Sequence, residues 1–364
     1  MSQTQIFKKI NTIKKSNPQN LMAKYFDEQY FSSLDESQKN RLEKMMASGL
    51  ENPDSQMGIY ANEADDYATF APYLDLIIRD YHKISPDIKI SHKSDWDVDK
   101  TNCNLSNIDE VLAEVSMRVR VARNVEGFPL PAAMSKQQRL DFEKLAIKAF
   151  VELGKHSGFG GKYISISPNS PFEVSAKEYQ RYVDAHQMFK DMSKDAYLNS
   201  AGISGDWSHG RGMYISREED FIVWVGEEDH LRIMCMQKGG DLNGMFKKLS
   251  EGVKILGEIL PAFSSSEKYG NLASCPSNIG ASMRASLHMK LPNLTKNGEE
   301  LEKVKSEAEN LGLAVRGVLG EHSDADASGT VDISPSARLG VNERQIMERL
   351  FNGAKSLWQL ENKQ

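Results

Sequence analysis

The sequence predicts a small all-α N-terminal domain followed by an α+β domain with a mainly antiparallel sheet flanked by helices. Up to residue 81 the apolar residues recur with helical spacing. From residue 115 onward, runs with a two-residue alternation lie between longer helical patterns, and several are joined by short turns. Residues 85–107 are polar, contain Pro86 and show little periodicity, which indicates a linker. We therefore place the domains at residues 1–95 and 96–364.

The first domain is predicted to be helical from a cap and from its apolar spacing. Ser33-Leu34-Asp35-Glu36 has the form of a capping box, and the segment SQKNRLEKMM after it is a good helix former. Residues 63–81 continue with helical spacing of large apolar side chains. These side chains are Tyr67, Phe70, Leu74, Ile77 and Ile78.

The second domain begins with a predicted strand over residues 115–123, VSMRVRVAR. A second capping box, Ser135 to Gln138, predicts a helix that ends near Gly154. The side chains expected to face inward along it are Leu140, Leu145, Ala149 and Leu153. Further strands are predicted at KYISIS, FIVWV, LRIMCMQ, SMRASLHMK and LAVRGVL, and further helices over residues 242–260, 299–311 and 343–360.

Composition limits the classes of protein to consider. The 364 residues are 26% charged and 40% hydrophobic with a net charge of −6, which is ordinary for a globular protein and disfavours nucleic acid or an anionic membrane as partner. Three cysteines, Cys103, Cys235 and Cys275, do not make a disulfide framework. No apolar stretch suits a signal peptide or a membrane span. We expect a cytoplasmic protein.

Arginines recur on the polar faces of the predicted strands. Ser282, Arg284, Ser286, His288 and Lys290 share one face of their strand, and Ser116, Arg118 and Arg120 share one face of another. Arg232 and Arg316 lie in two further runs. Guanidinium groups bind phosphate oxygens through paired hydrogen bonds, and neither a Walker-type loop nor a dinucleotide fingerprint occurs. This pattern favours a nucleotide polyphosphate site, with solvated surface charges as the alternative.

Two acidic segments and one thiol complete the candidate chemistry. Glu227, Glu228 and Asp229 form an acidic turn between two apolar runs, Glu321 lies in a small polar segment, and Cys275 precedes the strand at 282–290. Each has an ordinary structural explanation: a hydrated turn, a surface loop and a buried thiol. Taken together, two separated carboxylates and a thiolate suit a substrate with a delocalised positive charge.

Five segments carry a resemblance to a known family: MGIYANEADDY, SMRVRVARNVEGFPL, VWVGEEDHLRIMCMQ, CPSNIGASMRASLHMKLP and VRGVLGEHSDA. Over nearly its whole length the chain resembles the phosphagen kinases (ATP:guanidino phosphotransferases), above all those that act on L-arginine. The resemblance implies a glutamine synthetase-like catalytic domain. It also implies reversible transfer of the γ-phosphoryl group of ATP to L-arginine, giving phosphoarginine and ADP for energy buffering, with Mg²⁺ carried by the nucleotide.

The same resemblance implies a role for each matching residue. Nucleotide binding falls to Ser116, Arg118, Arg120, Arg232, Arg284, His288 and Arg316. Catalysis and guanidinium binding fall to Glu228, Glu321 and Cys275, the last as a thiolate of low pKa beside cations and the bound guanidinium. The remainder of the substrate, including its carboxylate, falls to the loop Ser55, Gln56, Met57, Gly58, Ile59 and Tyr60.

The choice of guanidino substrate is less sharply indicated. The short loop at Ser55, together with Tyr81 and Glu321, resembles the arginine-specific members rather than creatine kinases. A kinase for taurocyamine or lombricine, or a catalytically silent nucleotide-binding relative, remains as an alternative. The departures from the family pattern are Gln56, Ile215, Gly226 and Leu319. Both monomers and homodimers are compatible with the resemblance.

Overall fold

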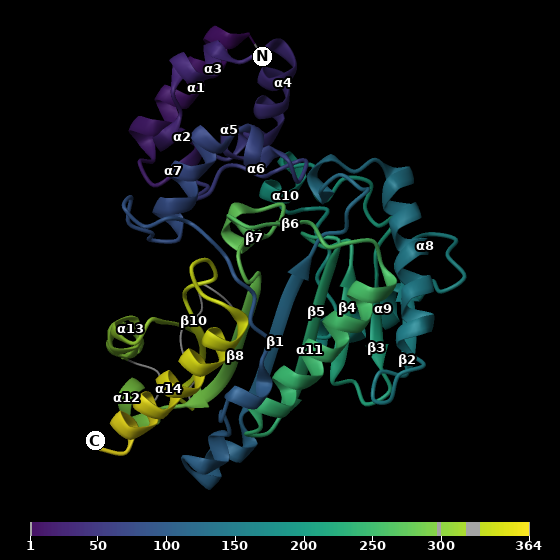
Figure 1. The fold of residues 1–364 in the computed structure, drawn as a ribbon, viewed down its shortest axis with the longest axis vertical. Coiled ribbons are helices and arrows are strands. Elements are labelled where there is room, and N and C mark those ends of the chain that lie inside the picture. Colours follow the sequence, from purple (N-terminus) through teal and green to yellow (C-terminus); the bar gives the residue numbers. More distant parts are fainter. Residues whose placement is uncertain (1, 297–299, 318–327, 364) are drawn as a thin grey trace.

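The computed structural model describes residues 2–296, 300–317 and 328–363. A small helical domain lies at one end of a larger α+β domain (Figure 1). Its helices are α1 (Gln3–Ser16), α2 (Leu21–Tyr25), α3 (Glu28–Ser33), α4 (Glu36–Met45), α5 (Ala47–Glu51), α6 (Asp66–Thr69) and α7 (Ala71–Tyr81). The predicted all-α N-terminal domain is therefore confirmed.

The larger domain is built on an eight-stranded sheet in the order β2-β3-β4-β5-β1-β8-β10-β9. All seven pairings between neighbours are antiparallel, as the sequence predicts. The strands are β1 (Ser116–Arg123), β2 (Gly161–Ser165), β3 (Gly212–Ser216), β4 (Phe221–Val225), β5 (Leu231–Lys238), β8 (Met283–Lys290), β9 (Leu313–Gly317) and β10 (Thr330–Pro335). A separate hairpin pairs β6 (Ser265–Ser266) with β7 (Gly270–Asn271).

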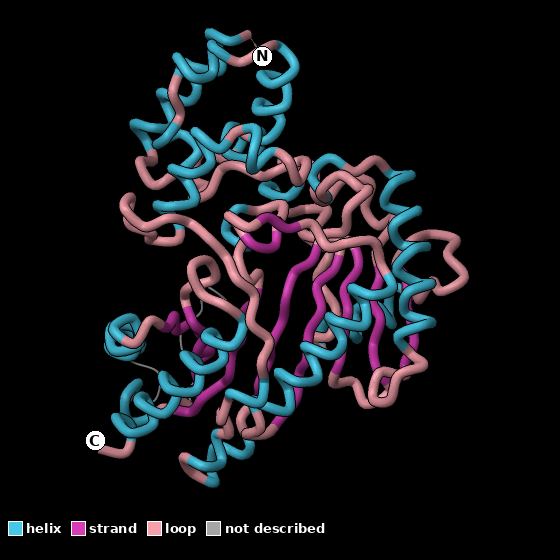
Figure 2. The backbone as a smooth tube through the Cα atoms, in the orientation of Figure 1, coloured by secondary structure: helices cyan, strands magenta, loops and turns pink. Residues whose placement is uncertain are grey.

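Helices flank this sheet, and α11 and α14 lie along its front face in Figure 2. The α-helices of the domain are α8 (Lys136–Leu153), α9 (Ala176–Asp184), α10 (Ala196–Ser200), α11 (Leu242–Ile259), α12 (Pro292–Thr295), α13 (Leu301–Asn310) and α14 (Glu343–Glu361). Short 3-10 helices occur at Val98–Lys100, Leu105–Asn107, Glu110–Glu114, Pro131–Ala133 and Pro276–Asn278. Among the helices within the described ranges, none combines the length and apolarity needed to cross a bilayer.

The two faces of the sheet are covered unequally, and this difference places the site. On one face, Met117, Val119 and Val121 of β1 join a large core with α8, α11 and α14. On the other face, a smaller apolar cluster that includes Ile222 and Trp224 covers the strands on the β2 side. Because side chains alternate along a strand, the polar side chains of β1 and β8 point to the second face, in the part that this smaller cluster leaves open.

The predicted cap at Ser33 is wrong. Helix α4 starts after Asp35, whose carboxylate accepts the backbone N–H of Gln38 at 2.8 Å, while the Gln38 side chain bonds back to the Asp35 N–H. Ser33 instead ends α3, and its hydroxyl donates to the Tyr30 carbonyl. Aspartate is as good an N-cap as serine, so two overlapping caps competed in this sequence.

The predicted helix over residues 63–81 is divided into α6 and α7 at Phe70. Pro72 stands in the first turn of α7, where a backbone N–H has no partner within the helix and its loss costs nothing. In a single helix over 63–81 the same position would need that N–H as a donor, so the helix is interrupted before it. Of the predicted inward face of α8, Ala149 and Leu153 are buried as expected, whereas Leu140 and Leu145 are only half-buried and Phe142 is buried in their place. Its cap at Ser135 and its end at Gly154 are confirmed.

The N-terminal domain packs directly against the segment that carries Cys275. The Ala61 N–H donates to the Ser274 carbonyl at 2.7 Å, and the Tyr67 hydroxyl donates to the Ala273 carbonyl at 2.7 Å. Cys275 belongs to the same apolar cluster as the N-terminal helices. The thiol is therefore positioned by both parts of the chain, and the boundary at residues 95/96 stays a prediction.

Tyr67→Phe is expected to lower the free energy of unfolding by about 1–3 kcal/mol, because it leaves the buried Ala273 carbonyl without its donor. The ring itself, packed on Tyr269 with centroids 5.5 Å apart, is retained. Urea unfolding measures the change. Tyr25→Phe, which removes a more exposed hydroxyl bonded to Asp80, is the matched control and should cost less. Equal losses in the two variants would contradict a stabilising role for the Tyr67–Ala273 hydrogen bond.

Candidate functional site

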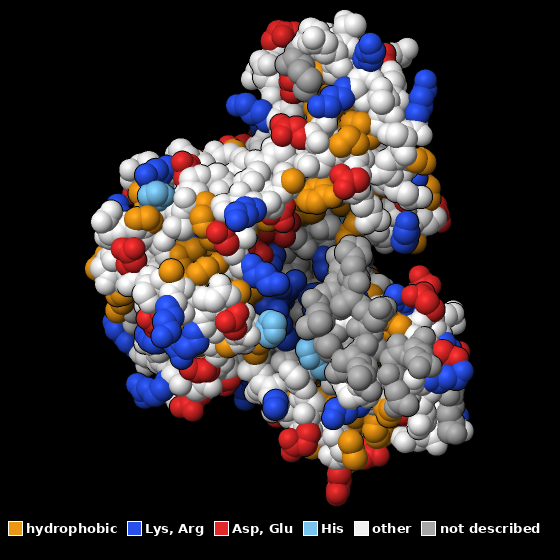
Figure 3. Space-filling view, turned by 180° about the vertical axis from the view of Figure 1, so that it is seen from behind, with side chains coloured by type: hydrophobic (Ala, Val, Ile, Leu, Met, Phe, Trp, Pro, Cys, Tyr) orange, Lys and Arg blue, Asp and Glu red, His pale blue; other side chains and the backbone are white. Residues whose placement is uncertain are grey.

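Four arginines from β1, β5 and β8 lie on the less covered part of the second sheet face. Arg120 of β1 stands opposite Arg284 of β8, and Ala122 stands opposite Arg232 of β5. Arg118 lies over the Trp224 ring at 5.3 Å from its centroid. Figure 3 shows Lys and Arg side chains gathered in a hollow of this face, with acidic side chains beside them.

These cations lie close enough to disfavour one another's charge. Burial, then Arg232 and Arg284, lower the pKa of Arg118 to about 10. Burial, then Arg232 and Arg118, hold the pKa of Arg120 well below its ordinary value. Among the described residues, the buried Nε of Arg118 has no hydrogen-bond partner. A crowded and partly unsatisfied guanidinium cluster is suited to a polyanion, which would neutralise it.

Part of this positive charge is balanced within the chain. Arg232 pairs with Glu227 at 2.7 Å and with Glu228 at 3.3 Å. Arg284 pairs with Asp332 of β10 at 2.9 Å, and Nε2 of His288 lies 3.8 Å from the same carboxylate. Glu227 was predicted only as part of the acidic turn, and Asp332 was missed from sequence, although it alternates with the apolar Val331 and Ile333 in β10.

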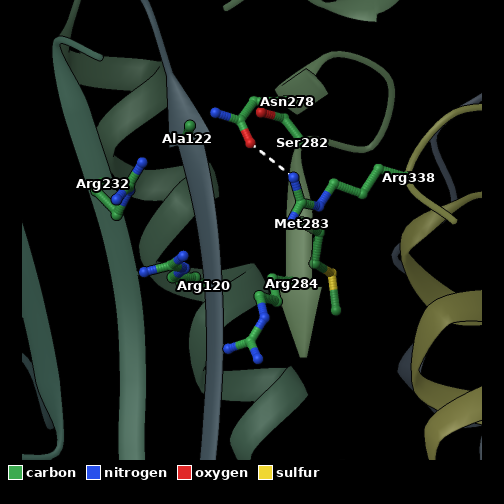
Figure 4. Close-up of a pocket in the computed structure, with 8 residues that line it drawn as sticks. All are labelled: Arg120, Ala122, Arg232, Asn278, Ser282, Met283, Arg284 and Arg338. Atoms are coloured by element: carbon green, nitrogen blue, oxygen red, sulfur yellow. Dashed lines mark hydrogen bonds between the residues drawn. The ribbon is translucent and has the colours of Figure 1, made fainter. Parts of the chain in front are cut away.

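A hollow of about 270 Å³ lies between these strands. Its lining residues are Arg120, Ala122, Arg232, Asn278, Ser282, Met283, Arg284 and Arg338. Arg338 donates to Oδ1 of Asn278 at 2.8 Å, drawn as the dashed line in Figure 4, and to the Ser277 carbonyl at 3.1 Å. Arg338 and Asn278 were both missed from sequence, because each lies in a segment without periodicity.

Glu228 and Cys275 lie at one side of this hollow. Nδ2 of Asn278 donates to Oε2 of Glu228 at 3.4 Å, and Sγ of Cys275 lies 3.0 Å from Oγ of Ser277. Burial raises the pKa of Glu228 to about 7 against the opposing effect of Arg232. Burial, followed by Glu228, raises the pKa of Cys275 to about 12. These two groups influence each other's charge, so they share one environment.

Without substrate, the surroundings of Cys275 raise its pKa, so the low pKa expected with a bound guanidinium stays a prediction. The thiol is 5% exposed and its strongest electrostatic neighbour is the carboxylate of Glu228, not an arginine. Both influences favour the neutral thiol. Among the described residues these influences keep the thiol neutral, and a cation bound beside Cys275 would favour the thiolate.

The raised pKa of Glu228 makes stability depend on pH. Between its ordinary value of 4.5 and its folded value of about 7, the unfolded chain has lost this proton and the folded chain has kept it. Stability from this group therefore falls as the pH rises through that window and is constant above it.

Glu228→Gln, which mimics the protonated carboxyl, is expected to raise Tm relative to the parent protein at about pH 8 and to leave it nearly unchanged at about pH 4.5. Thermal melts at the two pH values measure this difference. The same stabilisation at both values would contradict it, because the ionised carboxylate would then not be the cause.

The loop predicted to hold the rest of the substrate faces the same region. Burial raises the pKa of the Tyr60 phenol, and Cys275 and Glu228 add to the effect, which places Tyr60 beside both. Gly58 has φ +71° and a Cβ there would lie 2.8 Å from Oδ1 of Asn20, so glycine is needed. The Gly58 N–H donates to Oγ of Ser55 at 3.0 Å, which rigidifies the turn. Within it, Gln56 is exposed and Met57 buried.

The remaining predicted residues lie at the edges of the site or outside the described ranges. Ser116 stands opposite His288 farther along the β1–β8 ladder. Arg316 of β9 stands opposite Asp332, and it lines a second hollow with Tyr81, Ser277 and Arg338. Glu321 and Leu319 lie outside the described residues, so the predictions for them stay predictions.

Two of the noted departures have local structural explanations. Gly226 has φ +71°, and a Cβ there would lie 2.6 Å from the Gly210 carbonyl oxygen, so the acidic turn requires glycine at this point. Ile215 is buried in the apolar cluster on the second sheet face, where it packs with Ile222 and other apolar side chains. Within the described ranges, no group of three or more His, Cys, Asp or Glu side chains is placed to hold a metal ion.

Two family models match the chain. One described as "ATP:guanido phosphotransferase, C-terminal catalytic domain" matches residues 141–364. One described as "ATP:guanido phosphotransferase, N-terminal domain" matches residues 16–79. Together they cover most of the helical domain, including the loop at residues 55–60, and every strand of the large sheet except β1, which lies between the two matched ranges.

Curated relatives and solved structures agree with this. An arginine kinase of Haliotis madaka is 39% identical over 312 residues, 85% of this chain and 82% of the relative. One of Anthopleura japonica is 35% identical over 357 residues, 95% of this chain but 47% of the relative's length. The substrate-free duplicated taurocyamine kinase of Schistosoma mansoni superposes with TM-score 0.83 at 31% identity, over 97% of this chain and 48% of that one. A lombricine kinase structure superposes with TM-score 0.83 at 25% identity, over 94% and 92%.

Proposed function

Because this chain belongs to the ATP:guanido phosphotransferase family, the phosphagen kinases, we propose that it transfers the γ-phosphoryl group of MgATP reversibly to L-arginine. The products are ADP and phosphoarginine, which stores the phosphoryl group as an energy buffer. The observation that carries the proposal is a guanidinium cluster next to a pocket of carboxylate and thiol. The guanidinium cluster suits a triphosphate, and the pocket of carboxylate and thiol suits a cationic acceptor.

The nucleotide's phosphates bind to Arg118, Arg120, Arg232 and Arg284, with Arg316 at the edge. In the protein without ligand these side chains crowd one another or pair with Glu227 and Asp332. A bound triphosphate relieves the repulsion and holds the arginines around the transferred group. In phosphoryl transfer such positioning and charge stabilisation supply most of the catalysis. Mg²⁺ enters as part of the substrate, bound to the phosphates.

The guanidinium of the acceptor binds between Glu228 and Cys275. Its positive charge lowers the pKa of both groups, so Glu228 ionises fully and the thiol of Cys275 becomes a thiolate only when substrate is present. Ionised Glu228 then orients the attacking nitrogen and accepts its proton. Glu321 adds a second carboxylate in this proposal, and Ser55, Gln56, Met57, Gly58 and Tyr60 hold the amino-acid end.

The choice of L-arginine is supported by the short loop at Ser55 and by the arginine kinases among the relatives. The taurocyamine and lombricine kinase structures favour a second candidate, another guanidino acceptor. A coupled assay of ADP release with L-arginine, taurocyamine, lombricine and creatine decides between them. The highest kcat/KM with L-arginine supports the proposal. A higher kcat/KM with another compound would make that compound the proposed substrate. No turnover with any of the four would overturn the proposed activity.

A further inference from the structure

Asn124, the residue directly after β1, connects three separate segments at the floor of the site. It is 1% exposed, and its side chain makes three hydrogen bonds. Nδ2 donates to Oδ1 of Asp229 at 2.6 Å and to the Leu272 carbonyl at 3.0 Å. Oδ1 accepts the His230 N–H at 2.9 Å. Both N–H bonds and the carbonyl of this amide are therefore used.

Two of these segments carry the groups assigned to the acceptor guanidinium. Asp229 and His230 directly follow Glu228, and Leu272 lies three residues before Cys275. Oδ1 of Asp229 also accepts the Ser274 N–H at 3.0 Å, so Asp229 joins the acidic turn to the residue next to Cys275. Asn124 thus contacts both sides of the pocket without lining the hollow between the arginines.

The Asp229 carboxylate depends strongly on Asn124. Among the described residues, its buried Oδ2 has no hydrogen-bond partner, and the same is true of Oγ of Ser274. The carboxylate is therefore held through Oδ1 alone, and Asn124 supplies one of the two donors there. Loss of that donor would leave a buried carboxylate with a single N–H.

We propose that Asn124 is a positioning residue that sets the placement of Glu228 relative to Cys275. The proposal rests on the function proposed above, since it concerns the geometry of the guanidinium pocket. Of the four phosphate-binding arginines on these strands, only Arg232 contacts the acidic turn within the described ranges, and the backbone of all four is held by the β5–β1–β8 register, in which Arg120 stands opposite Arg284. A change at Asn124 should therefore act on turnover and leave nucleotide binding in place.

Asn124→Asp tests this with almost no change in shape. It keeps the acceptor for the His230 N–H, removes both donors, and places one carboxylate against another. We expect kcat to fall about 100-fold, as for a displacement of about 1 Å in a catalytic pair. The Kd for MgADP should stay within about threefold.

Asn243→Asp is the matched control. Asn243 also makes three hydrogen bonds, to Thr101 and Cys103 at the linker, and lies outside the site. It should lower Tm without lowering kcat. Should Asn124→Asp not fold, Asn124→Ser and Asn243→Ser, which add no charge, make the same comparison. Equal losses of kcat at the two positions, or full kcat in the Asn124 variant, overturn the proposal.

Alkylation of Cys275 by iodoacetamide, followed by mass spectrometry of its peptide, separates this proposal from the proposed function. Cys275 is buried, so displacing its segment should raise the rate about tenfold in Asn124→Asp and not in Asn243→Asp. If the parent protein turns over no guanidino compound, the proposed function fails. The alkylation rates still test the role of Asn124 in that case. A faster alkylation of Cys275 in Asn124→Asp supports the positioning of Cys275 by Asn124, and an unchanged rate overturns it.

Discussion

Glu228→Gln is expected to lower kcat by about 10²- to 10⁴-fold, the range for loss of a general base. The side chain lies at the hollow between the strands, 19% exposed, with Arg232 and Asn278 as hydrogen-bond partners. Glutamine retains that shape but carries no charge for the acceptor guanidinium and accepts no proton. Steady-state kinetics with L-arginine and MgATP measure kcat, and calorimetry measures MgADP binding, which should change little.

Glu227→Gln is the matched control for this result. Glu227 is the adjacent carboxylate and pairs with the same Arg232 at 2.7 Å, but no contact joins it to Asn278 or Cys275 among the described residues. It should therefore retain most of kcat. If Glu227→Gln loses as much kcat as Glu228→Gln, the effect acts through Arg232, and Glu228 is not the group that meets the acceptor.

Arg120→Gln is expected to weaken MgADP binding about 10- to 100-fold, since a hydrogen bond to a charged group contributes roughly 1.5–3 kcal/mol. It should also lower kcat by about 10²- to 10³-fold, as removal of one preorganised donor does. Arg120 is held between Arg118, Arg232 and Arg284, which disfavour its charge. The same substitution should therefore raise Tm of the protein without ligand, because it relieves repulsion.

Arg181→Gln, on the exposed side of α9, is the control for loss of one positive charge. It should change neither MgADP affinity nor Tm appreciably. Isothermal calorimetry and thermal melts, each with and without MgADP, supply both quantities. An Arg120 variant that binds MgADP like the parent protein would contradict the assignment of this face to the phosphates, whatever its kcat.

Much of the fold could be predicted because its signals are local. The strands at residues 115–123 and 282–290 and the cap of α8 depend on neighbours within a few residues. Strand β3 was missed because its apolar run, Met213 to Ile215, is short and bounded by Gly212 and Ser216, and β10 was missed because it ends in Pro335. The cap at Ser33 was wrong because Asp35 offers an equally good cap two residues later.

The site divides in the same way. Alternation alone predicted that Arg118 and Arg120 share the polar face of one strand and that Arg284 lies on the polar face of another, whereas their assignment to the nucleotide came from the family resemblance. Asp332, which balances Arg284, lies in another strand, and Asn278, which donates to Glu228, lies in a segment without periodicity, so no pattern near the arginines indicates these contacts. The raised pKa of Cys275 without substrate could not be read from sequence, because burial and the neighbouring Glu228 are properties of the assembled pocket.

The sequence alone determined which side chains share a face of a strand and which family the chain resembles. Both depend only on residues close together in the chain, through the two-residue period of a strand and the residue order of a motif. Only the tertiary structure decided that Arg120 faces Arg284, that Glu228 and Cys275 influence each other's charge, and that Asn124 joins their two segments. These relations depend on register and burial between residues up to 164 positions apart (120 and 284), and such distances are set by packing rather than by neighbouring residues.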